Sequence, residues 1–211
     1  MTSRTRLLLG PFAALLLGLG IALLPAMLAD YDSVRQTVSE IGEMDSPARI
    51  PFTILMCTVA ALLIVFASGV RDVSRASGRS PLAAYFIVFA AISAAGVGIF
   101  SFPHPLHNVF GTSELIGYQA PLVMALTWRR DPRAGGLVRL SWIMFALVWV
   151  AIAINISTFD RHGALFALER PFYGLIQRSL FATWFAWVTL AGLWLYRRTA
   201  QASARSTAAK A

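Results

Sequence analysis

The chain contains six apolar segments, each close to the length of a helix that crosses a bilayer. A spanning helix needs about 20 predominantly apolar residues. The chain is 57% hydrophobic and only 13% charged, whereas a soluble domain carries about a quarter charged residues. We therefore predict an all-α integral membrane protein, folded as a bundle of six helices. The predicted spans cover residues 7–28, 51–70, 82–102, 108–128, 137–156 and 171–196.

The apolar segments follow one another without a long polar insertion, which indicates one membrane domain over residues 1–198. Residues 199–211 are rich in Ala, Ser and Thr and are expected to form a disordered cytoplasmic tail. The first apolar segment is too long for a signal peptide, so we expect it to be retained as a helix. A single cysteine, Cys57, excludes an internal disulfide.

The distribution of charge predicts the orientation of the chain. Most of the 18 Lys and Arg residues fall at the two ends and in the loops after the second and fourth spans. Cytoplasmic segments are enriched in Lys and Arg, and most of the acidic residues fall in the alternate loops. We expect both termini on the cytoplasmic side of the inner (plasma) membrane. The net charge of +8 then faces anionic lipid, and the bilayer, rather than a nucleic acid, is the expected partner.

The longest predicted loop, before the second span, carries signals of a short helix. Ser33 and Gln36 have the spacing of a capping box. Val34, Val38 and Ile41 follow at helical spacing on one face. We expect an amphipathic helix at the outer membrane surface. It either covers an outward-facing pocket or closes the end of the bundle.

Polar residues inside predicted spans indicate a candidate site, because a charged group there costs roughly 2.5–3.5 kcal/mol on insertion scales. Such residues gather in the outer half of the bundle. We predict an outward-facing polar pocket that binds a lipid head group or a small amphiphile. An alternative is a Glu114–Arg178 ion pair that fixes helix register in a structural or regulatory subunit without a ligand site. The predicted pocket residues are Glu114, Tyr118, Asn155, Gln177 and Arg178.

A second alternative is a membrane-embedded lipid-modifying enzyme or hydrolase. His104, His107 and His162 lie in predicted outer loops, and zinc accepts imidazole ligands in tetrahedral geometry. No histidine lies deep within a span, which argues against a haem held by two histidines. Lys210 in the tail is the only lysine, which argues against a retinal Schiff base in the bundle.

Several short motifs follow one another along the chain. Tyr31 precedes a Ser-x-x-Gly stretch after the first span, the third span ends in a Gly and Phe-Pro pattern, and His107 precedes the fourth span. A Gly-Leu-x-Gln-Arg stretch lies in the sixth span. These motifs are Val38-Ser39-Glu40-Ile41-Gly42, Gly98 to Phe102-Pro103, and Gly174-Leu175-Ile176-Gln177-Arg178.

In order and spacing these motifs resemble the bacterial and archaeal membrane family catalogued as domain of unknown function 998 (DUF998). The resemblance extends from Leu7 to about Tyr196 and implies the six-helix fold and the position of the polar site. Family members often carry Gly and a second histidine after the first one, whereas Asn108 and Gly111 occupy those places here. The resemblance implies no particular activity.

Overall fold

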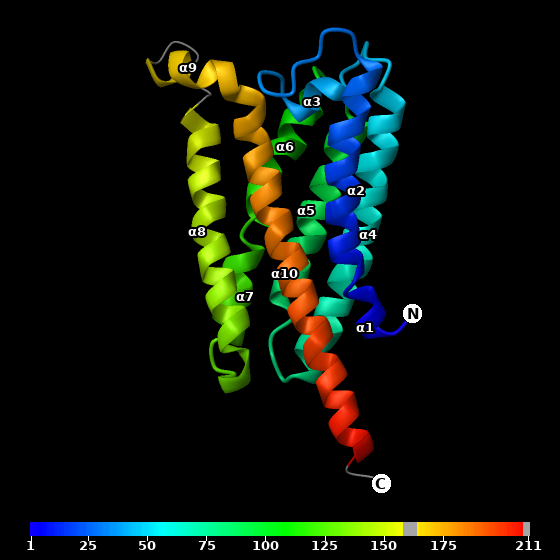
Figure 1. The fold of residues 1–211 in the computed structure, drawn as a ribbon, viewed down its shortest axis with the longest axis vertical. Helices are drawn as coiled ribbons and strands as arrows, with labels where there is room; N and C mark the ends of the chain where they lie inside the picture. Colours follow the sequence, from blue (N-terminus) through cyan, green and yellow to red (C-terminus); the bar gives the residue numbers. More distant parts are fainter. Residues whose placement is uncertain (158–163, 209–211) are drawn as a thin grey trace.

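The computed structural model is an elongated bundle of helices that run along one common direction (Figure 1). It describes residues 1–157 and 164–208. Over those residues the chain contains helices and no strand, which confirms the all-α prediction. Five helical stretches are long and apolar enough to cross a membrane, as a multi-pass membrane protein requires. They are Ser3–Met27, Arg49–Ala76, Leu82–Ile99, Pro132–Ser157 and Leu165–Gln201.

The helices extend beyond most of the predicted apolar segments. Helical hydrogen bonds continue past the apolar stretch because a polar helix end is stable at the membrane surface. The last helix therefore continues past the predicted end of its span, into residues expected to form the tail. The elements of the first half are α1 (Ser3–Arg6), α2 (Leu9–Leu23), η1 (Leu24–Met27), α4 (Arg49–Ala76) and α5 (Leu82–Ile99). Those of the second half are η2 (Pro132–Ala134), α8 (Gly135–Ser157), α9 (Ala164–Glu169), η3 (Arg170–Phe172) and α10 (Tyr173–Ala208).

The fourth predicted span is not one continuous helix. It is divided into α6 (Pro105–Gly117) and α7 (Ala120–Trp128). The division has a local cause in Pro121, which lacks the N–H that a continuous helix needs and whose ring crowds the carbonyl four residues earlier. The side chain of Gln119 donates to the carbonyl of Leu115 at 2.9 Å, so one carbonyl near the break keeps a donor. Discontinuous helices occur in membranes where neighbouring protein satisfies the freed groups.

The loop helix is shorter than predicted and begins later. It is α3 (Val38–Ile41), and its capping box joins Thr37 and Glu40 rather than Ser33 and Gln36. Val38 is buried, as is the last residue of the helix. The expectation of a helix starting at Ser33 was wrong because Thr37 and Glu40 form the stronger cap, four residues later.

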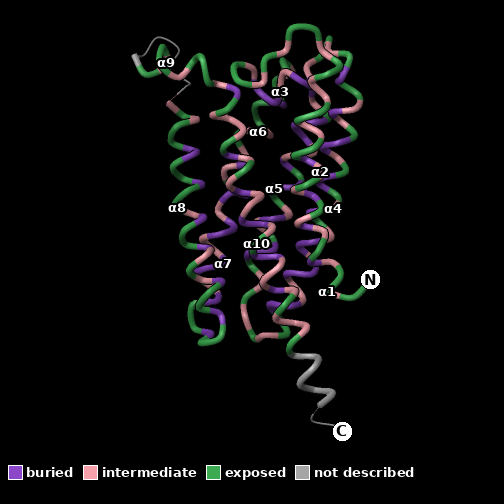
Figure 2. The backbone as a smooth tube through the Cα atoms, in the orientation of Figure 1, coloured by how far each residue is buried: buried purple, intermediate pink, exposed green. Residues whose placement is uncertain are grey.

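The buried residues lie on the inward-facing sides of the helices, and the exposed residues lie on the outside of the bundle (Figure 2). The core includes Phe66, Trp184 and Trp187, all nearly inaccessible. Large apolar side chains such as Ile143 and Val150 remain exposed on α8, as lipid contact favours. Helix α5 packs against α4, α6 and α7. Its small residues allow this close approach.

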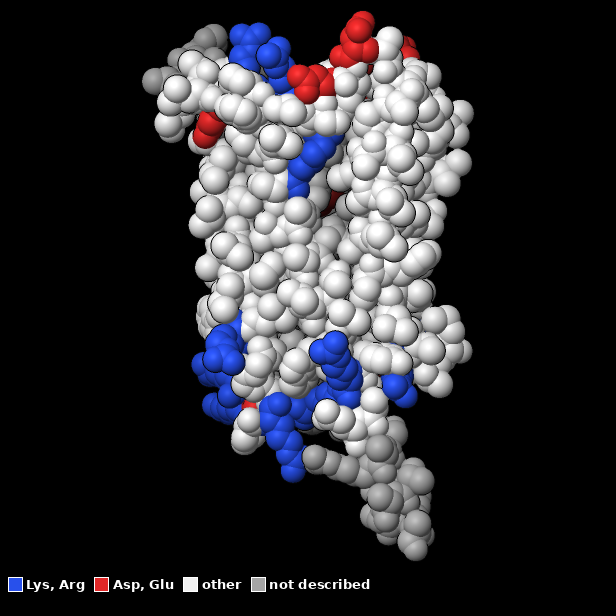
Figure 3. Space-filling view, in the orientation of Figure 1, with Lys and Arg blue, Asp and Glu red and all other residues white. Residues whose placement is uncertain are grey.

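Both termini lie at the same end of the bundle (Figure 1), which we call the terminal end. The opposite end, which carries α3, α9 and the segment between η1 and α4, is called the loop end. Basic side chains gather at the terminal end, and acidic side chains lie mainly at the loop end (Figure 3). Most of the long helices therefore run between a basic surface at the terminal end and a surface with both acidic and basic side chains at the loop end.

Ion pairs hold helices together at the terminal end. Arg6 pairs with Asp72 at 2.5 Å, joining α1 to α4. Arg198 of α10 pairs with Asp131 at 2.6 Å. The guanidinium of Arg198 also lies over the rings of Trp128 and Trp194, 5.3 and 5.4 Å from their centroids. These contacts position the long last helix against the α7–α8 turn.

Candidate functional site

A cavity of about 30 Å³ lies inside the bundle, enclosed mainly by apolar side chains. Its walls come from α2, α3, α4, α5, α6 and α10, so most helices contribute. A space of this size holds about one or two water molecules. The side chains that shape it include Leu17, Val38, Met56, Val59, Phe181 and Phe185.

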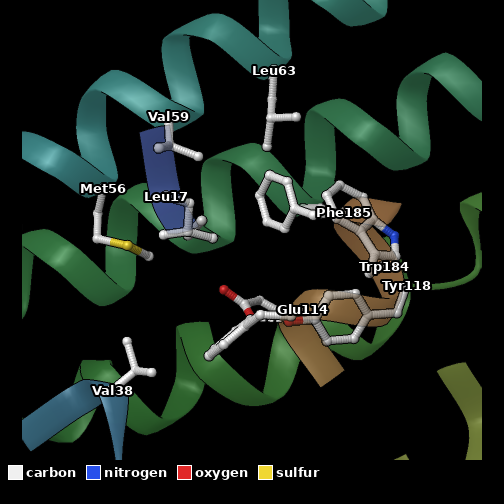
Figure 4. A pocket seen from close by; sticks show the side chains of 12 residues that line it. Leu17, Val38, Met56, Val59, Leu63, Glu114, Tyr118, Trp184 and Phe185 are labelled. Atoms are coloured by element: carbon white, nitrogen blue, oxygen red, sulfur yellow. Dashed lines mark hydrogen bonds between the residues drawn. The ribbon is translucent and has the colours of Figure 1, made fainter. Parts of the chain in front are cut away.

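Among the described residues that line the cavity, Glu114 is the only acidic one. Its carboxyl group extends into the space that Leu17, Val38 and Met56 surround (Figure 4). The hydroxyl of Tyr118 donates to Glu114 Oε2 at 2.5 Å. The two side chains are one helical turn apart. Both residues are buried. Glu114 lies in the last turn of α6, and Tyr118 follows the last residue of that helix, at the division from α7.

The described structure offers Glu114 no basic partner. Ion pairs among the described residues do not include Glu114, and they do not include Arg178. The ion pair considered as an alternative is therefore not formed over the described part of the chain. An isolated charge in apolar surroundings costs several kcal/mol, so a donor or a cation in the cavity would stabilise a charged carboxylate.

Aromatic rings surround the carboxyl–phenol pair. The ring of Tyr118 packs edge-on against Trp184, with centroids 5.8 Å apart. Trp184 packs edge-on against Phe185 at 5.1 Å. The faces of aromatic rings attract cations. The cavity thus combines one carboxyl group with several rings, a combination suited to a positively charged group.

Arg178 lies at the loop end of α10, where it binds the segment that precedes α3. Its Nη1 lies 2.8 Å from the carbonyl oxygens of both Ser33 and Gln36. Its Nη2 donates to the hydroxyl of Tyr31 at 2.7 Å. These bonds attach the first loop to the last long helix. We call this set of contacts, with those of Gln177 and Gly174, the loop clamp.

Gln177 and Gly174 complete the loop clamp. Gln177 Oε1 accepts a hydrogen bond from the backbone N–H of Val38 at 2.6 Å, which satisfies a free donor in the first turn of α3. A side chain at Gly174 would collide with the carbonyl oxygens of Ser33 and Gln36. The absence of a side chain at this position therefore allows the loop to approach α10. Since Val38 also lines the cavity, the clamp holds part of the cavity wall.

Tyr31 stabilises the same loop from its other side. Its hydroxyl donates to the carbonyl of Thr37 at 2.7 Å. Burial raises the pKa of the Tyr31 phenol, and the nearby Arg178 guanidinium opposes this only in part. The phenol therefore keeps its proton at neutral pH, as its role as a donor requires.

Asn155 joins two helices rather than facing the cavity. Its Nδ2 donates to the carbonyl of Ala151 at 2.8 Å and to that of Ile176 at 3.0 Å. It thereby fixes α8 against α10 beside the clamp. The structure brings Glu114 and Tyr118 together at the cavity, and it places Gln177 and Arg178 in the clamp above it.

The predicted histidines have separate positions and separate bonds. His104 caps α6, with Nδ1 accepting from the N–H of Leu106 at 3.1 Å. The buried His107 has Nδ1 at 2.8 Å from the carbonyl of Phe100 and Nε2 at 3.0 Å from Ser39 Oγ. His162 lies outside the described residues. Within the described residues, no three His, Cys, Asp or Glu side chains gather as a metal ion requires.

Two features of the site were not predicted from sequence. The aromatic wall from α10 was missed because Phe181 and Trp184 look like ordinary lipid-facing or core residues in a span. The Thr37–Glu40 capping box was missed although its Thr-x-x-Glu pattern is visible in the sequence. That pattern is the signal that could have placed α3 correctly.

The helices, their apolar outer faces and the internal cavity define the class as multi-pass helical membrane proteins. A family model described as "Protein of unknown function (DUF998)" matches residues 10–194. The chain belongs to this family, as its motifs suggested. Neither a curated protein nor a solved structure matches the chain.

Proposed function

We propose that the chain crosses the membrane six times, with α6 and α7 together forming the fourth crossing. Two observations support this topology. The α6–α7 pair runs from the loop end toward the terminal end (Figure 1), and both termini lie at one end, which requires an even number of crossings. The basic terminal end then faces the cytoplasm of the cell's inner membrane, in accord with the enrichment of Lys and Arg there.

We further propose that the protein binds a small amphiphile with a cationic head. The cavity between the helices receives the head, and the apolar tail extends toward lipid. The observation that carries this proposal is the buried Glu114 carboxyl in an aromatic and apolar cavity, bonded to Tyr118 and without a basic partner among the described residues. A cationic head would supply the missing charge.

The route to the cavity is lateral in this proposal. Leu17 of α2 and Phe181 and Phe185 of α10 are all part of its wall. Figure 3 shows a furrow along the boundary between α10 and α2, with acidic atoms visible below the surface. The two phenylalanines are only half-buried, so rotation of their side chains would widen a cavity that is now small.

The roles of the five predicted site residues divide accordingly. Glu114 and Tyr118 contact the ligand in this proposal. Gln177 and Arg178 are positioning residues that hold Val38 over the cavity, and Asn155 positions α8 against α10. The terminal end and the exposed apolar side chains contact the bilayer, which is the protein's permanent partner.

The test is a thermal-shift titration of the purified protein in nanodiscs with octylamine, octanol and octanoate. Each probe has eight carbon atoms in an unbranched chain, and the three differ in the charge of the head group. Octylamine is expected to raise the unfolding temperature most, because binding to the folded state adds stability of about 2.7 kcal/mol at 100 times the Kd. Octanoate is expected to have no such effect, because its charge repels Glu114.

Two variants locate the effect. Glu114→Gln removes the charge with little change of shape and is expected to abolish the preference for octylamine. Glu43→Gln makes the same change at the loop end, away from the cavity lining, and is expected to leave the preference intact. Equal shifts with all three probes, or an unchanged preference in Glu114→Gln, would overturn the proposal.

A further inference from the structure

A second hollow lies at the loop end, beside α3 and η3, and is open to solvent. Its volume is about 570 Å³, within the range of ligand pockets in proteins. The described residues that line it are Arg35, Glu40, Phe166, Arg170, Pro171 and Tyr173. None of these residues lines the inner cavity, and none belongs to the loop clamp as defined above.

Two guanidinium groups in this hollow have donors to spare. Arg170 forms no ion pair among the described residues. Arg35 approaches Asp32 only at 3.5 Å, and its side chain is 72% exposed. A guanidinium group carries five N–H donors in a fixed plane. Most of these donors therefore remain available to an anion.

The one carboxylate among the described lining residues already accepts several hydrogen bonds. Glu40 Oε1 accepts from the backbone N–H and the hydroxyl of Thr37, both at 2.9 Å. Its Oε2 accepts from Gln36 Nε2 at 3.0 Å. These donors stabilise its negative charge without neutralising Arg35 or Arg170. Among the described residues that line the hollow, the two arginines therefore outnumber the one carboxylate.

Exposed apolar side chains lie on two short helices that contribute to the hollow. Leu165, Leu168 and Phe172 are 60%, 72% and 55% exposed on α9 and η3. Exposed apolar side chains on a short helix at a membrane surface favour insertion among lipid chains. The guanidinium groups then lie at the level of the lipid head groups, where phosphate is abundant.

We propose that this hollow is a second binding site, which takes a phosphate-bearing anion through Arg35 and Arg170. Guanidinium groups match phosphate oxygens in pairs. Tyr173, which also lines the hollow, carries a hydroxyl that can serve as a further donor. This site is independent of the proposed cationic amphiphile in the inner cavity, since the two sites select opposite charges.

The phosphate could belong to a lipid head group or to a free solute, and one titration separates these sources. Protein in nanodiscs of zwitterionic lipid is titrated calorimetrically with inorganic phosphate, glycerol 3-phosphate and dihexanoylphosphatidylglycerol. Binding of the short-chain lipid at least tenfold more tightly than of the two solutes identifies a lipid head group. Comparable binding of all three identifies free phosphate. Either result supports the site if it depends on the arginines.

Three variants test whether binding depends on the arginines of the hollow. Arg170→Gln and Arg35→Gln are each expected to weaken binding at least tenfold. Arg49→Gln removes the same charge from an exposed position at the loop end, outside the hollow, and is expected to change the Kd less than twofold. Similar losses in all three variants, or binding unaffected by Arg170→Gln, would overturn the proposal. Glu114→Gln is expected to leave this titration unchanged, so failure here does not bear on the amphiphile site.

Discussion

The hydroxyl of Tyr118 donates to the carboxyl group of Glu114 at 2.5 Å, one turn back along α6 and at the division of α6 from α7. The bond is buried among apolar side chains, where an unpaired polar group costs about 1–3 kcal/mol. The division of the helix is thus accompanied by a polar pair in the interior. The two features together mark the part of the bundle where binding is proposed.

Removing the phenol hydroxyl should destabilise the protein. Tyr118→Phe leaves the Glu114 carboxyl without its donor and is expected to lower the free energy of unfolding by about 1–3 kcal/mol. In a Glu114→Gln background the same change should cost less, because a hydrogen bond to a neutral amide oxygen is weaker than one to a carboxylate. The free energy of unfolding in mixed micelles is measured for both single variants and the double variant. The three values together give the interaction energy between the two side chains. Additive losses would contradict a direct interaction.

Releasing the loop clamp should loosen the first loop. Arg178→Lys keeps the charge but loses the planar set of donors that reaches Tyr31 and two carbonyl groups. Faster hydrogen–deuterium exchange is expected over residues 31–41, with α8 unchanged. Arg49→Gln serves as the control and should leave exchange in that loop as in the parent protein. An unaltered loop in Arg178→Lys would show that the clamp does not hold it.

A pair of glycine substitutions should have opposite effects. Gly174→Ala places a methyl group against the carbonyl oxygens of Ser33 and Gln36, so the loop must move and stability should fall. Gly18→Ala adds a methyl group where nothing lies within 4 Å, and a glycine inside a helix is about 0.5–1 kcal/mol less stable than alanine. Stability should therefore rise slightly. The measurement is the thermal unfolding temperature of both variants. An unchanged unfolding temperature in Gly174→Ala would contradict the close approach of the loop to α10.

His107 is expected to act through hydrogen bonds that join two parts of the loop end. His107→Ala removes the bonds to Phe100 and Ser39 and should cost about 1–3 kcal/mol, the penalty for buried polar groups left unsatisfied. Unfolding temperature is measured with and without a chelator. A loss of stability that the chelator reproduces in the parent protein would favour the metal alternative.

The Asp131–Arg198 pair should make the stability of the protein depend on pH in the acidic range. Burial of Asp131 tends to raise its pKa, but hydrogen bonds from Arg133 N–H and the Arg198 guanidinium outweigh it, and the pKa is lowered. Because its pKa is lowered in the folded state, ionised Asp131 stabilises the fold at any pH above the ordinary aspartate pKa of about 3.9. That stabilisation is lost as the pH falls through the pKa of the folded state. The stability difference between parent and Asp131→Asn should therefore shrink below about pH 4. A difference independent of pH would contradict this linkage.

Most of the fold could be predicted from the apolar segments, because the thickness of the bilayer dictates the length of a spanning helix. The division of the fourth segment was not predicted, although Pro121, which prevents a continuous hydrogen-bond pattern, is visible in the sequence. The partners of Arg178 were not readable. They are backbone carbonyl oxygens, which every residue carries, so no pattern of residue types identifies them. Glu114 was recognised as costly, but the aromatic wall around it depends on how α10 is rotated, and composition does not determine that rotation.

The loop clamp also orders the events of biosynthesis. Arg178 reaches carbonyl groups that lie 145 and 142 positions earlier in the chain, and the N-terminal part of a protein emerges first from the ribosome. Until α10 enters the membrane, the first loop has no donors from Arg178, and the cavity lacks its wall of Phe181, Trp184 and Phe185. A nascent chain that stalls before its last helix thus presents an open, unsealed bundle that quality-control proteases can recognise.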